Sequence, residues 1–485
     1  MSAISHQVAE RSATYEVTQQ LTSASDLQWT TMGEISEVVG GGTPKTNDPT
    51  NFEGGDVPWI TPADLSGYTA KCISRGNRFI TRKGLASSGA RLLPAGSVLF
   101  TSRAPIGYVA IAGNPIATNQ GFKSFVLKDC VLPEYVYWWL KGSKHRAEEL
   151  ASGTTFLELS GANAKKIPIP VVPLERQRAV VAEIEKQFSR LDEAVAGLKR
   201  IKANLKRYKA AILKAAVEGR LVPTEADLAR REGRSFETGP QLLQRILDSR
   251  RSQWQGKGKY KEPVASNTTN LPELPEGWVW SCFEQVTLEL ANGYAKRSQA
   301  DGLPYIVLRL ADIADGEISY EDVRRINCLS EEAAKYVLHP NDFIVIRVNG
   351  SAELVGRLVL VGRASETVLY CDHFIRGRCG LPELAVWLRR YADVESFRRY
   401  IDLNKVSSAG QNTISQGVLS QCPIPLPPIA EQHRIVAEVD RLFSIARETE
   451  AEVEANLKRA QALRQATLQQ AFSGQAYSSR TEVIQ

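Results

Sequence analysis

Long hydrophobic runs are missing from this 485-residue sequence, and cysteine and histidine are sparse. No apolar stretch approaches the roughly 18 residues that a membrane-spanning helix needs, so no membrane association is expected. The first 20 residues have no apolar centre followed by a small-residue cleavage site, which argues against a secretory signal. Seven cysteines without a CxxC pair predict neither a disulfide framework nor a zinc ribbon. These absences favour a cytoplasmic location.

Sequence motifs of common catalytic sites are also absent. Gly258-Lys259 precedes a tyrosine, so it is not a phosphate-binding loop, and Gly40–Gly42 lack the GxGxxG spacing. GxSxG and HExxH do not occur, nor does the Asn/Asp-Pro-Pro-aromatic motif with which amino-methyltransferases hold a flipped base. We therefore predict no catalytic residue, no metal site and no cofactor bound by this chain. Among five scattered histidines, only His373 is a candidate functional residue.

The basic residues are concentrated in one stretch. The chain has 60 basic and 54 acidic residues, a surplus of +6. The stretch from Val171 to Val222 carries an equal surplus, and Lys199–Lys214 contains basic residues but no acidic ones. Such a stripe is compatible with DNA phosphates or a protein partner, but taken alone it favours a solvated helix face.

An internal repeat organises the sequence. Residues 168–188 read PIPVVPLERQRAVVAEIEKQF and residues 423–443 read PIPLPPIAEQHRIVAEVDRLF, with nine of 21 positions identical at an offset of 255. In both copies prolines precede a heptad-like apolar pattern, which predicts a long helix with a defined start. For the first copy we expect a helix over 174–217, about 66 Å long at 1.5 Å per residue.

Each helix has one apolar stripe and so needs a partner, for which the other copy is available. We predict that the two pair antiparallel about a pseudo-twofold axis, forming an intramolecular coiled coil. The alternative is that each helix only covers its own globular segment. The predicted contact residues are Leu174, Val181, Ile184, Phe188, Leu191, Ile429, Val436, Val439 and Phe443.

Two mixed globular segments precede the helices, which predicts an α+β fold. Strands are expected at 97–100 and 343–346, and helices at 133–140 and 382–391. Faint parallels, such as Asn119–Phe122 with Cys371–Phe374, suggest one duplicated fold. The predicted organisation is a polar extension (1–26), a first domain (27–167), a first helix (168–222), a linker with one short helix (223–270), a second domain (271–422), a second helix (423–477) and a tail (478–485).

Several short motifs together resemble a known family. They are Gly41-Gly42-Thr43-Pro44, Pro58-Trp59-Ile60, the string from Thr101 to Gly107, the string from Asn119 to Lys123, and the repeated PIP…P…Q…(I/V)VAE. The set resembles the specificity (S) subunit of type I restriction–modification enzymes over about residues 27–477. The second globular segment lacks the SRAPIG-like and NQGF-like strings.

The resemblance implies two target recognition domains, each reading half of a split, asymmetric double-stranded DNA target, with the coiled coil as spacer. It implies docking of two methyltransferase (modification) subunits and, through them, motor-nuclease (restriction) subunits. S-adenosylmethionine, ATP and magnesium would belong to those partners, and this chain would be non-catalytic.

Candidate DNA contacts follow from the motifs, since DNA recognition needs phosphate contacts for position and base contacts for sequence. Each has a structural alternative, such as a solvated loop or an ion pair within the domain. The first domain offers Lys45, Thr46, Ser102, Arg103, Gln120 and Lys123; the second offers Lys296, Arg297, Arg347, Asn349 and His373. Arg347 and Asn349 are aligned with Thr101 and Arg103.

Three other functions remain open from the residues alone. A stand-alone nucleic-acid-binding protein would bind specifically without a partner. A coiled-coil adaptor would show no salt-dependent nucleic-acid binding. A nuclease or methyltransferase would show cofactor-dependent activity of the isolated chain.

Overall fold

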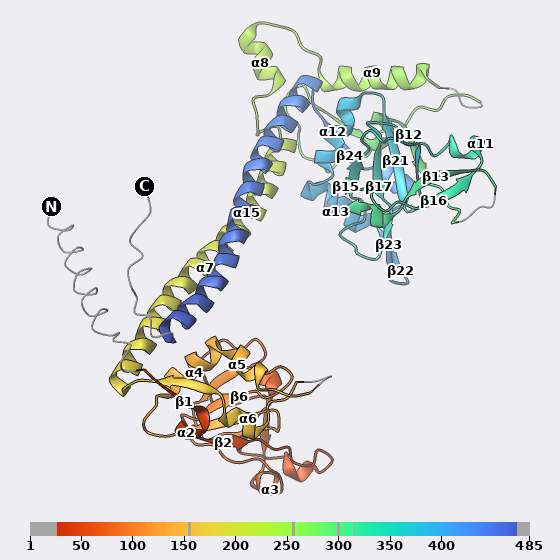
Figure 1. The fold of residues 1–485 in the computed structure, drawn as a ribbon. Helices are drawn as coiled ribbons and strands as arrows, with labels where there is room; N and C mark the ends of the chain where they lie inside the picture. The colour runs from red at the N-terminus through yellow and green to blue at the C-terminus, as the bar shows by residue number, and fades with distance from the viewer. Residues whose placement is uncertain (1–26, 154–156, 255–257, 298–300, 315, 473–485) are drawn as a thin grey trace, which may run out of the picture. The chain divides into compact units, whose positions relative to one another are not determined.

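The computed structural model describes residues 27–153, 157–254, 258–297, 301–314 and 316–472 (Figure 1). The chain divides into unit 1, with Met1–Lys199 and Glu454–Gln485, and unit 2, with Arg200–Val453. Both units contain sheets and helices, which confirms the α+β prediction. None of the described helices combines the length and apolar character that a membrane span requires.

The globular part of unit 1 is built on three sheets. A five-stranded sheet has the order β2-β9-β6-β7-β4, a three-stranded sheet the order β5-β3-β8, and β1 pairs with β10. Strands β2 and β9 run antiparallel, whereas β3 and β8 run parallel. The bounds are β1 (Gln28–Thr31), β2 (Ser36–Gly40), β3 (Val57–Ile60), β4 (Cys72–Ile73), β5 (Arg78–Ile80), β6 (Val98–Phe100), β7 (Val109–Ala112), β8 (Ala117–Thr118), β9 (Lys123–Leu127) and β10 (Pro168–Val171).

Helix α4 (Pro133–Gly142) covers the core of unit 1. Proline at its first position is compatible with the first turn, where no backbone N–H bond is lost. Its buried Tyr135, Val136 and Trp139 share a hydrophobic cluster with Phe100 and Phe125 of the sheet. The other short helices of unit 1 are α2 (Met32–Ile35), α3 (Arg82–Ala86), α5 (Lys144–Glu149) and α6 (Gly161–Lys165).

Unit 2 repeats this arrangement of strands. Its main sheet has the order β12-β21-β17-β19, its second sheet the order β16-β13-β20, and β11 pairs with β24. Strands β13 and β20 run parallel, as β3 and β8 do. The bounds are β11 (Val279–Cys282), β12 (Thr287–Asn292), β13 (Leu303–Leu308), β16 (Arg325–Cys328), β17 (Phe343–Ile346), β19 (Leu358–Leu360), β20 (Val368–Tyr370), β21 (Phe374–Cys379) and β24 (Pro423–Leu426). The predicted duplication is therefore visible in the topology.

Unit 2 also contains elements of its own. Strands β14 (Ile313–Ala314) and β15 (Glu317–Ile318) pair with each other, and a three-stranded sheet joins β18 (Val348–Asn349), β23 (Gln411–Thr413) and β22 (Val406–Ser408). The helices of its globular part are α10 (Phe283–Val286), α11 (Ser330–Ala333), α12 (Pro382–Tyr391), α13 (Glu395–Asn404) and α14 (Gln416–Ser420). The strands and helices predicted at 97–100, 343–346, 133–140 and 382–391 are confirmed by β6, β17, α4 and α12.

The segment between the two halves has more structure than the sequence predicted. Two helices, α8 (Glu225–Glu232) and α9 (Gly239–Ser252), occur where one was expected. Both start with a threonine whose hydroxyl accepts a backbone N–H bond, Thr224 from Asp227 and Thr238 from Gln241. Leu242 and Ile246 of α9 are buried in the core of unit 2, so α9 belongs to that core.

The two long helices are of equal length. Helix α7 spans Leu174–Val217 and α15 spans Ile429–Phe472, 44 residues each. Their first residues are 255 positions apart, which is the offset of the sequence repeat. The helix predicted over 174–217 is confirmed, whereas residues 168–171 of the segment 168–222 form strand β10. In both copies the proline-rich strand before the helix, β10 or β24, pairs with the strand that opens the globular domain.

The long helices pair antiparallel within each unit. In unit 1, Ile184 and Phe188 cluster with Leu468 and Phe472, and Asp192 forms an ion pair with Arg464. In unit 2, the Lys209 Nζ lies 2.6 Å from a Glu450 carboxylate oxygen, and Ile212 shares a cluster with Val439. Because the partner numbers fall as the α7 numbers rise, the antiparallel prediction is confirmed.

The buried seam differs in part from the predicted one. Val181, Ile184, Phe188 and Val439 are buried as predicted, while Leu174, Leu191, Ile429, Val436 and Phe443 are only half-buried. In α15 the fully buried seam runs through Ile435, Val439, Ala446, Val453 and Ala460. The apolar pattern does not predict Ile435, Ala446 and Ala460 as seam residues, because alanine contributes little to an apolar stripe and Ile435 lies next to the equally apolar Val436.

Candidate nucleic-acid interface

Four motifs of the first domain meet where four strands end. Gly41 follows β2, Ile60 ends β3, Ser102 follows β6, and the string from Asn119 to Phe122 connects β8 to β9. We call this place junction 1 and define it by Gly41–Thr43, Trp59–Ile60, Ser102 and Thr118–Phe122. Sequence reasoning found these motifs separately, and only the fold brings them together.

Backbone hydrogen bonds hold junction 1. The Gly41 N–H donates to the Phe122 carbonyl at 3.3 Å and the Gly42 N–H to the Thr118 carbonyl at 2.9 Å. The Ser102 N–H donates to the Gly121 carbonyl at 2.7 Å. A Cβ on Gly41 would lie 1.8 Å from the Asn119 carbonyl oxygen, so this position requires glycine.

Two further bonds attach β3 to the same place. The Asn119 N–H donates to the Ile60 carbonyl and the Trp59 indole N–H donates to the Gly42 carbonyl, at 2.9 and 3.0 Å. Trp59 is buried, and its only polar side-chain atom, the indole nitrogen, has its hydrogen-bond partner in the glycine-rich turn. The tryptophan of the Pro-Trp-Ile motif is thereby explained by packing.

The side chains of junction 1 differ in their access to solvent. Ser102 is fully buried, so its hydroxyl faces the domain interior. Gln120 is exposed, and its amide oxygen accepts a hydrogen bond from the Thr43 hydroxyl. Arg103 is half-exposed and pairs with Glu158, with 3.3 Å between Nη1 and Oε2. Of these predicted contacts, Gln120 presents the most accessible polar group.

The remaining candidates of the first domain lie beside junction 1. Lys45 and Thr46 are exposed in the loop after it, and the Lys45 carbonyl accepts a bond from the Asn51 side-chain amide at 3.0 Å. Lys123 is half-buried at the start of β9. Their roles as DNA contacts stay predictions.

The second domain contains the same junction. The Gly293 N–H donates to Phe374 and the Tyr294 N–H to Tyr370, at 3.2 and 2.8 Å, and the Arg347 N–H donates to His373 at 2.8 Å. These bonds repeat those of Gly41, Gly42 and Ser102. A Cβ on Gly293 would lie 2.1 Å from the Cys371 carbonyl oxygen, the clash found for Gly41. We call this place junction 2 and define it by Gly293–Tyr294, Leu308, Arg347 and Tyr370–Phe374.

The shared bonds correct two details of the sequence alignment. Arg347 corresponds to Ser102, and not to Thr101 as the sequence suggested, because both N–H groups donate to equivalent carbonyls. The sequence also suggests that Pro58-Trp59-Ile60 corresponds to Pro304-Tyr305-Ile306. The Cys371 N–H donates to the Leu308 carbonyl as the Asn119 N–H does to Ile60, so Ile60 corresponds to Leu308, two residues further along. Hydrogen bonds across strands decide such a register, whereas two short unlike strings do not.

Charged side chains surround junction 2. The Arg297 guanidinium lies 2.7 Å from a carboxylate oxygen of Asp372, and this contact raises the pKa of Arg297. The Arg347 Nη1 donates to the Asp372 carbonyl oxygen at 3.4 Å. Asp372, which the sequence analysis did not single out as a site residue, therefore contacts two predicted arginines. Its position next to His373 was the only signal that could have drawn attention to it.

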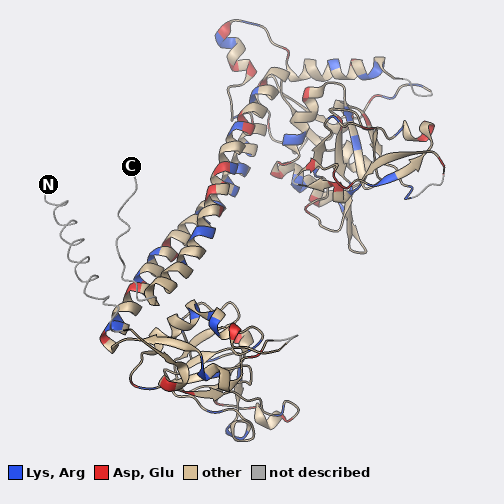
Figure 2. Ribbon diagram, viewed as in Figure 1, with Lys and Arg blue, Asp and Glu red and all other residues tan. Residues whose placement is uncertain are grey.

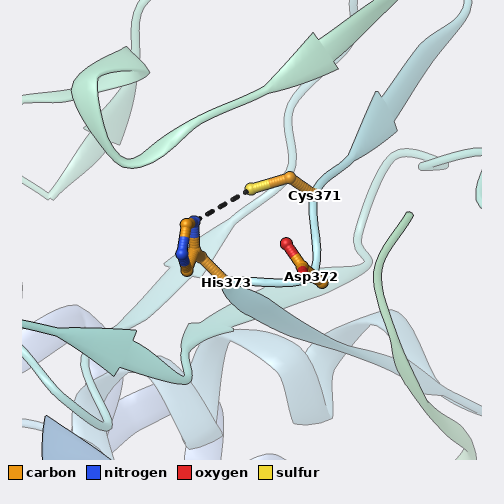
Figure 3. Close-up of side chains that lie close together, drawn as sticks. All are labelled: Cys371, Asp372 and His373. Carbon is orange, nitrogen blue, oxygen red and sulfur yellow. Dashed lines mark hydrogen bonds between the residues drawn. The ribbon is translucent and has the colours of Figure 1, made fainter. Parts of the chain in front are cut away.

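The turn that carries Asp372 also brings a thiol and an imidazole close together. Figure 3 shows the side chains of Cys371, Asp372 and His373 on this turn. The Cys371 Sγ lies 3.7 Å from the His373 Nδ1. Burial raises the pKa of the Cys371 thiol, which disfavours the thiolate that a metal ligand requires. The Asp372 carboxylate already faces Arg297, so the group fits a hydrogen-bonded turn better than a cation site.

The other two candidates of the second domain have partners within it. The Lys296 ammonium lies 3.0 Å from a Glu332 carboxylate oxygen. Asn349 lies on β18, and its side-chain oxygen accepts the Ser351 N–H at 2.8 Å. These contacts hold both side chains in place, and their roles toward DNA stay predictions.

The basic stretch of α7 has acidic neighbours on α15. Lys209 pairs with Glu450, and Figure 2 shows acidic and basic residues distributed along both long helices. Most of the other basic side chains from Lys199 to Lys214 are exposed. The stretch is therefore a solvated helix face with partial charge compensation, available to a partner.

A pocket of about 920 Å³ lies in unit 1 beside the paired helices. Tyr137, Trp138 and Lys141 of α4 line one side, and Phe188 and Arg464 of the long helices line another. Burial lowers the pKa of Lys141, with the Arg464 charge as a second cause. The acidic residues Glu185, Asp192 and Glu193 also line it, so the pocket has aromatic walls and charged groups of both signs.

Comparisons with known proteins agree with this architecture. Residues 25–207 match the family described as type I restriction modification DNA specificity domain. Over 348 residues the chain is 30% identical to the type I restriction enzyme StySPI specificity subunit of Salmonella potsdam, covering 71% of this chain and 66% of that protein. The chain belongs to the type I specificity-subunit family. A 150-residue segment is 47% identical to the MjaIX specificity subunit of Methanocaldococcus jannaschii, covering 30% of this chain and 34% of that protein.

The alignments span about two thirds of the StySPI subunit and about a third of the MjaIX subunit. Two solved specificity-subunit-type structures share the fold. The HsdS subunit from Thermoanaerobacter tengcongensis superposes with a TM-score of 0.53 at 19% identity, covering 93% of this chain and 97% of that one. A chain from a structure of complex assembly in the type I R-M system gives 0.59 at 18% identity, with 92% and 97% covered. The fold of the family thus extends over nearly the whole chain.

Proposed function

We propose that this chain is the DNA sequence-recognition subunit of a type I restriction–modification complex. Each globular domain reads one half of a bipartite, asymmetric target, with junctions 1 and 2 at the reading surface. The observation that carries this proposal is the pair of junctions, which share one backbone and present different side chains. Two equivalent scaffolds with different side chains suit two half-sites of different sequence.

The partners are part of the proposal. Two methyltransferase subunits dock on this chain, and the motor-nuclease subunits join through them in the cytoplasm. S-adenosylmethionine, ATP and magnesium belong to those partners, and this chain performs no catalytic step. The exposed basic stretch of α7 and the pocket of unit 1 are the surfaces that suit docking.

Methylome sequencing of the host, with the gene intact and deleted, tests the proposal. We expect one split, asymmetric methyladenine motif to vanish on deletion. A deletion without effect, combined with failure of the tagged chain to co-purify with a methyltransferase, would contradict it. Specific binding by the purified chain alone would favour the stand-alone DNA-binding alternative.

The helix pair supplies the spacing between the half-sites in this proposal. One heptad inserted between Lys199 and Arg200 and one between Leu457 and Lys458 would keep the apolar seam in register. Seven residues add about 10 Å of helix, which corresponds to about three base pairs of B-DNA. We expect the unread gap of the methylated motif to lengthen accordingly, and an unchanged gap would contradict the spacer role. A heptad inserted in α7 alone is the control, since it breaks the pairing.

A further inference from the structure

Junctions 1 and 2 share their backbone but not the chemistry of their side chains. The Phe122 and Phe374 carbonyls accept equivalent backbone bonds, from Gly41 and Gly293. Gln120 and Asp372 each lie two residues before these phenylalanines, so they occupy equivalent positions. Ser102 corresponds to Arg347 in the same way. One junction is therefore neutral at these two positions, and the other is charged.

In junction 1 the neighbouring loop orients the amide of Gln120. The Thr43 hydroxyl donates to Oε1, which leaves one lone pair on this oxygen and both N–H groups of the amide free for a ligand. The side chain is exposed, so donor and acceptor lie side by side at the surface. That pairing matches the N7 acceptor and N6 donor of adenine in the major groove.

In junction 2 a carboxylate orients a guanidinium. Asp372 contacts one amino group of Arg297, whose side chain remains 49% exposed. A planar guanidinium fixed on one side presents its other N–H groups as a fork. Two parallel donors match the O6 and N7 acceptors of guanine. Arg347 approaches the same turn from β17, so its charge reinforces the preference for an acceptor-rich base edge.

We infer that the two half-sites are read by different base chemistry: Gln120 contacts an adenine, and Arg297, positioned by Asp372, contacts a guanine. This inference rests on the proposed function and makes it more specific. The competing role for Arg297 is a phosphate contact, which would carry no sequence information.

The test uses the complex of this chain with its modification subunit and the motif found by methylome sequencing. Duplexes are made in which one guanine or adenine of the motif at a time is replaced by its 7-deaza analogue, which lacks the N7 acceptor. Dissociation constants are measured at one fixed salt concentration. If the intact complex methylates no bipartite motif, the proposed function is wrong. If it methylates such a motif but the variants below behave differently from expectation, only this inference is wrong.

For the wild-type complex we expect two positions to respond, one guanine in one half-site and one adenine in the other. Replacing either base by its 7-deaza analogue should weaken binding about tenfold. Arg297→Ala should bind the natural duplex about tenfold more weakly and lose the penalty at that guanine alone. Gln120→Ala should do the same at the adenine of the other half-site. Arg325→Ala, which removes an exposed arginine paired with Glu366 elsewhere in the second domain, and Gln28→Ala are matched controls that should keep both penalties.

Arg297→Lys separates base reading from phosphate contact. It retains the charge but loses the rigid fork, so the deaza-guanine penalty should shrink while the salt dependence stays unchanged. Retention of every penalty in both Arg297 variants, or a uniform loss of affinity for all duplexes, would overturn the inference. If Gln120→Ala leaves the deaza-adenine penalty unchanged, the inference for junction 1 is wrong.

The positioning role of Asp372 has its own readout. Asp372→Asn removes the carboxylate charge with little change of shape, and we expect it to reduce the deaza-guanine penalty. Asp372→Glu, which restores the charge, should restore part of that penalty. Equal penalties in wild type and Asp372→Asn would show that Arg297 does not depend on this contact.

Discussion

The first and second globular domains keep the same strand order around their junctions, yet the loops between equivalent strands differ. In domain 1 the connection from β6 to β7 is short, whereas in domain 2 the chain between β17 and β19 adds β18, which joins the hairpin β22–β23. Figure 1 shows this hairpin extending beyond the main sheet of unit 2. Gly107 and Gly356, both at positive φ, end the two loops with equivalent backbone bonds.

This comparison separates what the fold requires from what it leaves variable. The fold requires the glycine contact and the backbone bonds, because an unpaired buried N–H or a misplaced Cβ is costly. Side chains at the same positions change from serine to arginine and from glutamine to aspartate without altering these bonds. A duplicated domain can therefore acquire a new reading surface while its scaffold is retained.

The largest effect is expected at the glycines that both junctions share. Gly41→Ala and Gly293→Ala each place a Cβ about 2 Å from a carbonyl oxygen, so each should destabilise its domain by about 3 kcal/mol or more. Gly40→Ala is the matched control, because nothing lies within 4 Å of its Cβ, and it should change stability by less than about 0.5 kcal/mol. Denaturant unfolding measures all three, and a mild effect of either junction variant would break the equivalence.

A smaller, pH-dependent difference is expected where the repeat has Arg176 in one copy and Glu431 in the other. Glu431 is buried, accepts the Trp278 indole N–H at 3.0 Å and the Glu225 N–H at 2.9 Å, and burial raises its pKa. A raised carboxyl pKa means that the folded state binds the proton more tightly than the unfolded state. Stability should therefore rise as the pH falls through the raised pKa toward 4.5, relative to the variant Glu431→Gln.

Thermal unfolding of wild type and Glu431→Gln between pH 7 and pH 5 measures this difference. The neighbouring Glu225 faces Arg434 and Arg234, and its pKa is lowered, so its own loss of stability begins only at more acidic pH. Arg176→Gln should leave the pH dependence in this range unchanged, because arginine keeps its charge. Parallel curves for wild type and Glu431→Gln would show that Glu431 titrates normally.

The smallest effect is expected for the ion pairs of the two halves of the helix pair. Lys209 and Glu450 are 25% and 35% exposed, whereas Arg464 and Asp192 are 43% and 65% exposed. Since solvent screens exposed charges, double-mutant cycles should give about 0.5–1 kcal/mol for the first pair and less for the second. The reverse order would mean that burial does not govern these contacts.

The sequence predicted the parts of the fold that local patterns govern. Prolines before an apolar stripe located the start of α7 at Leu174, and the repeat offset of 255 located the start of α15. The family motifs are also local, because each is a short contiguous string of residues. The periodicity predicted Val436 as a buried seam residue, but the buried residue is Ile435. Adjacent apolar residues lie only 100° apart around a helix, so the pattern does not decide between them.

The composition, the repeat and the helical periodicity of this sequence by themselves determined two long helices, two related α+β domains and the absence of a recognisable catalytic motif. The tertiary structure alone decided that Gln120 contacts Thr43, that Asp372 contacts both Arg297 and Arg347, and that Ser102 is buried. The physical reason is distance along the chain. Helical patterns repeat within a few residues, whereas these contacts join segments tens of residues apart, and only the pairing of strands brings their ends together.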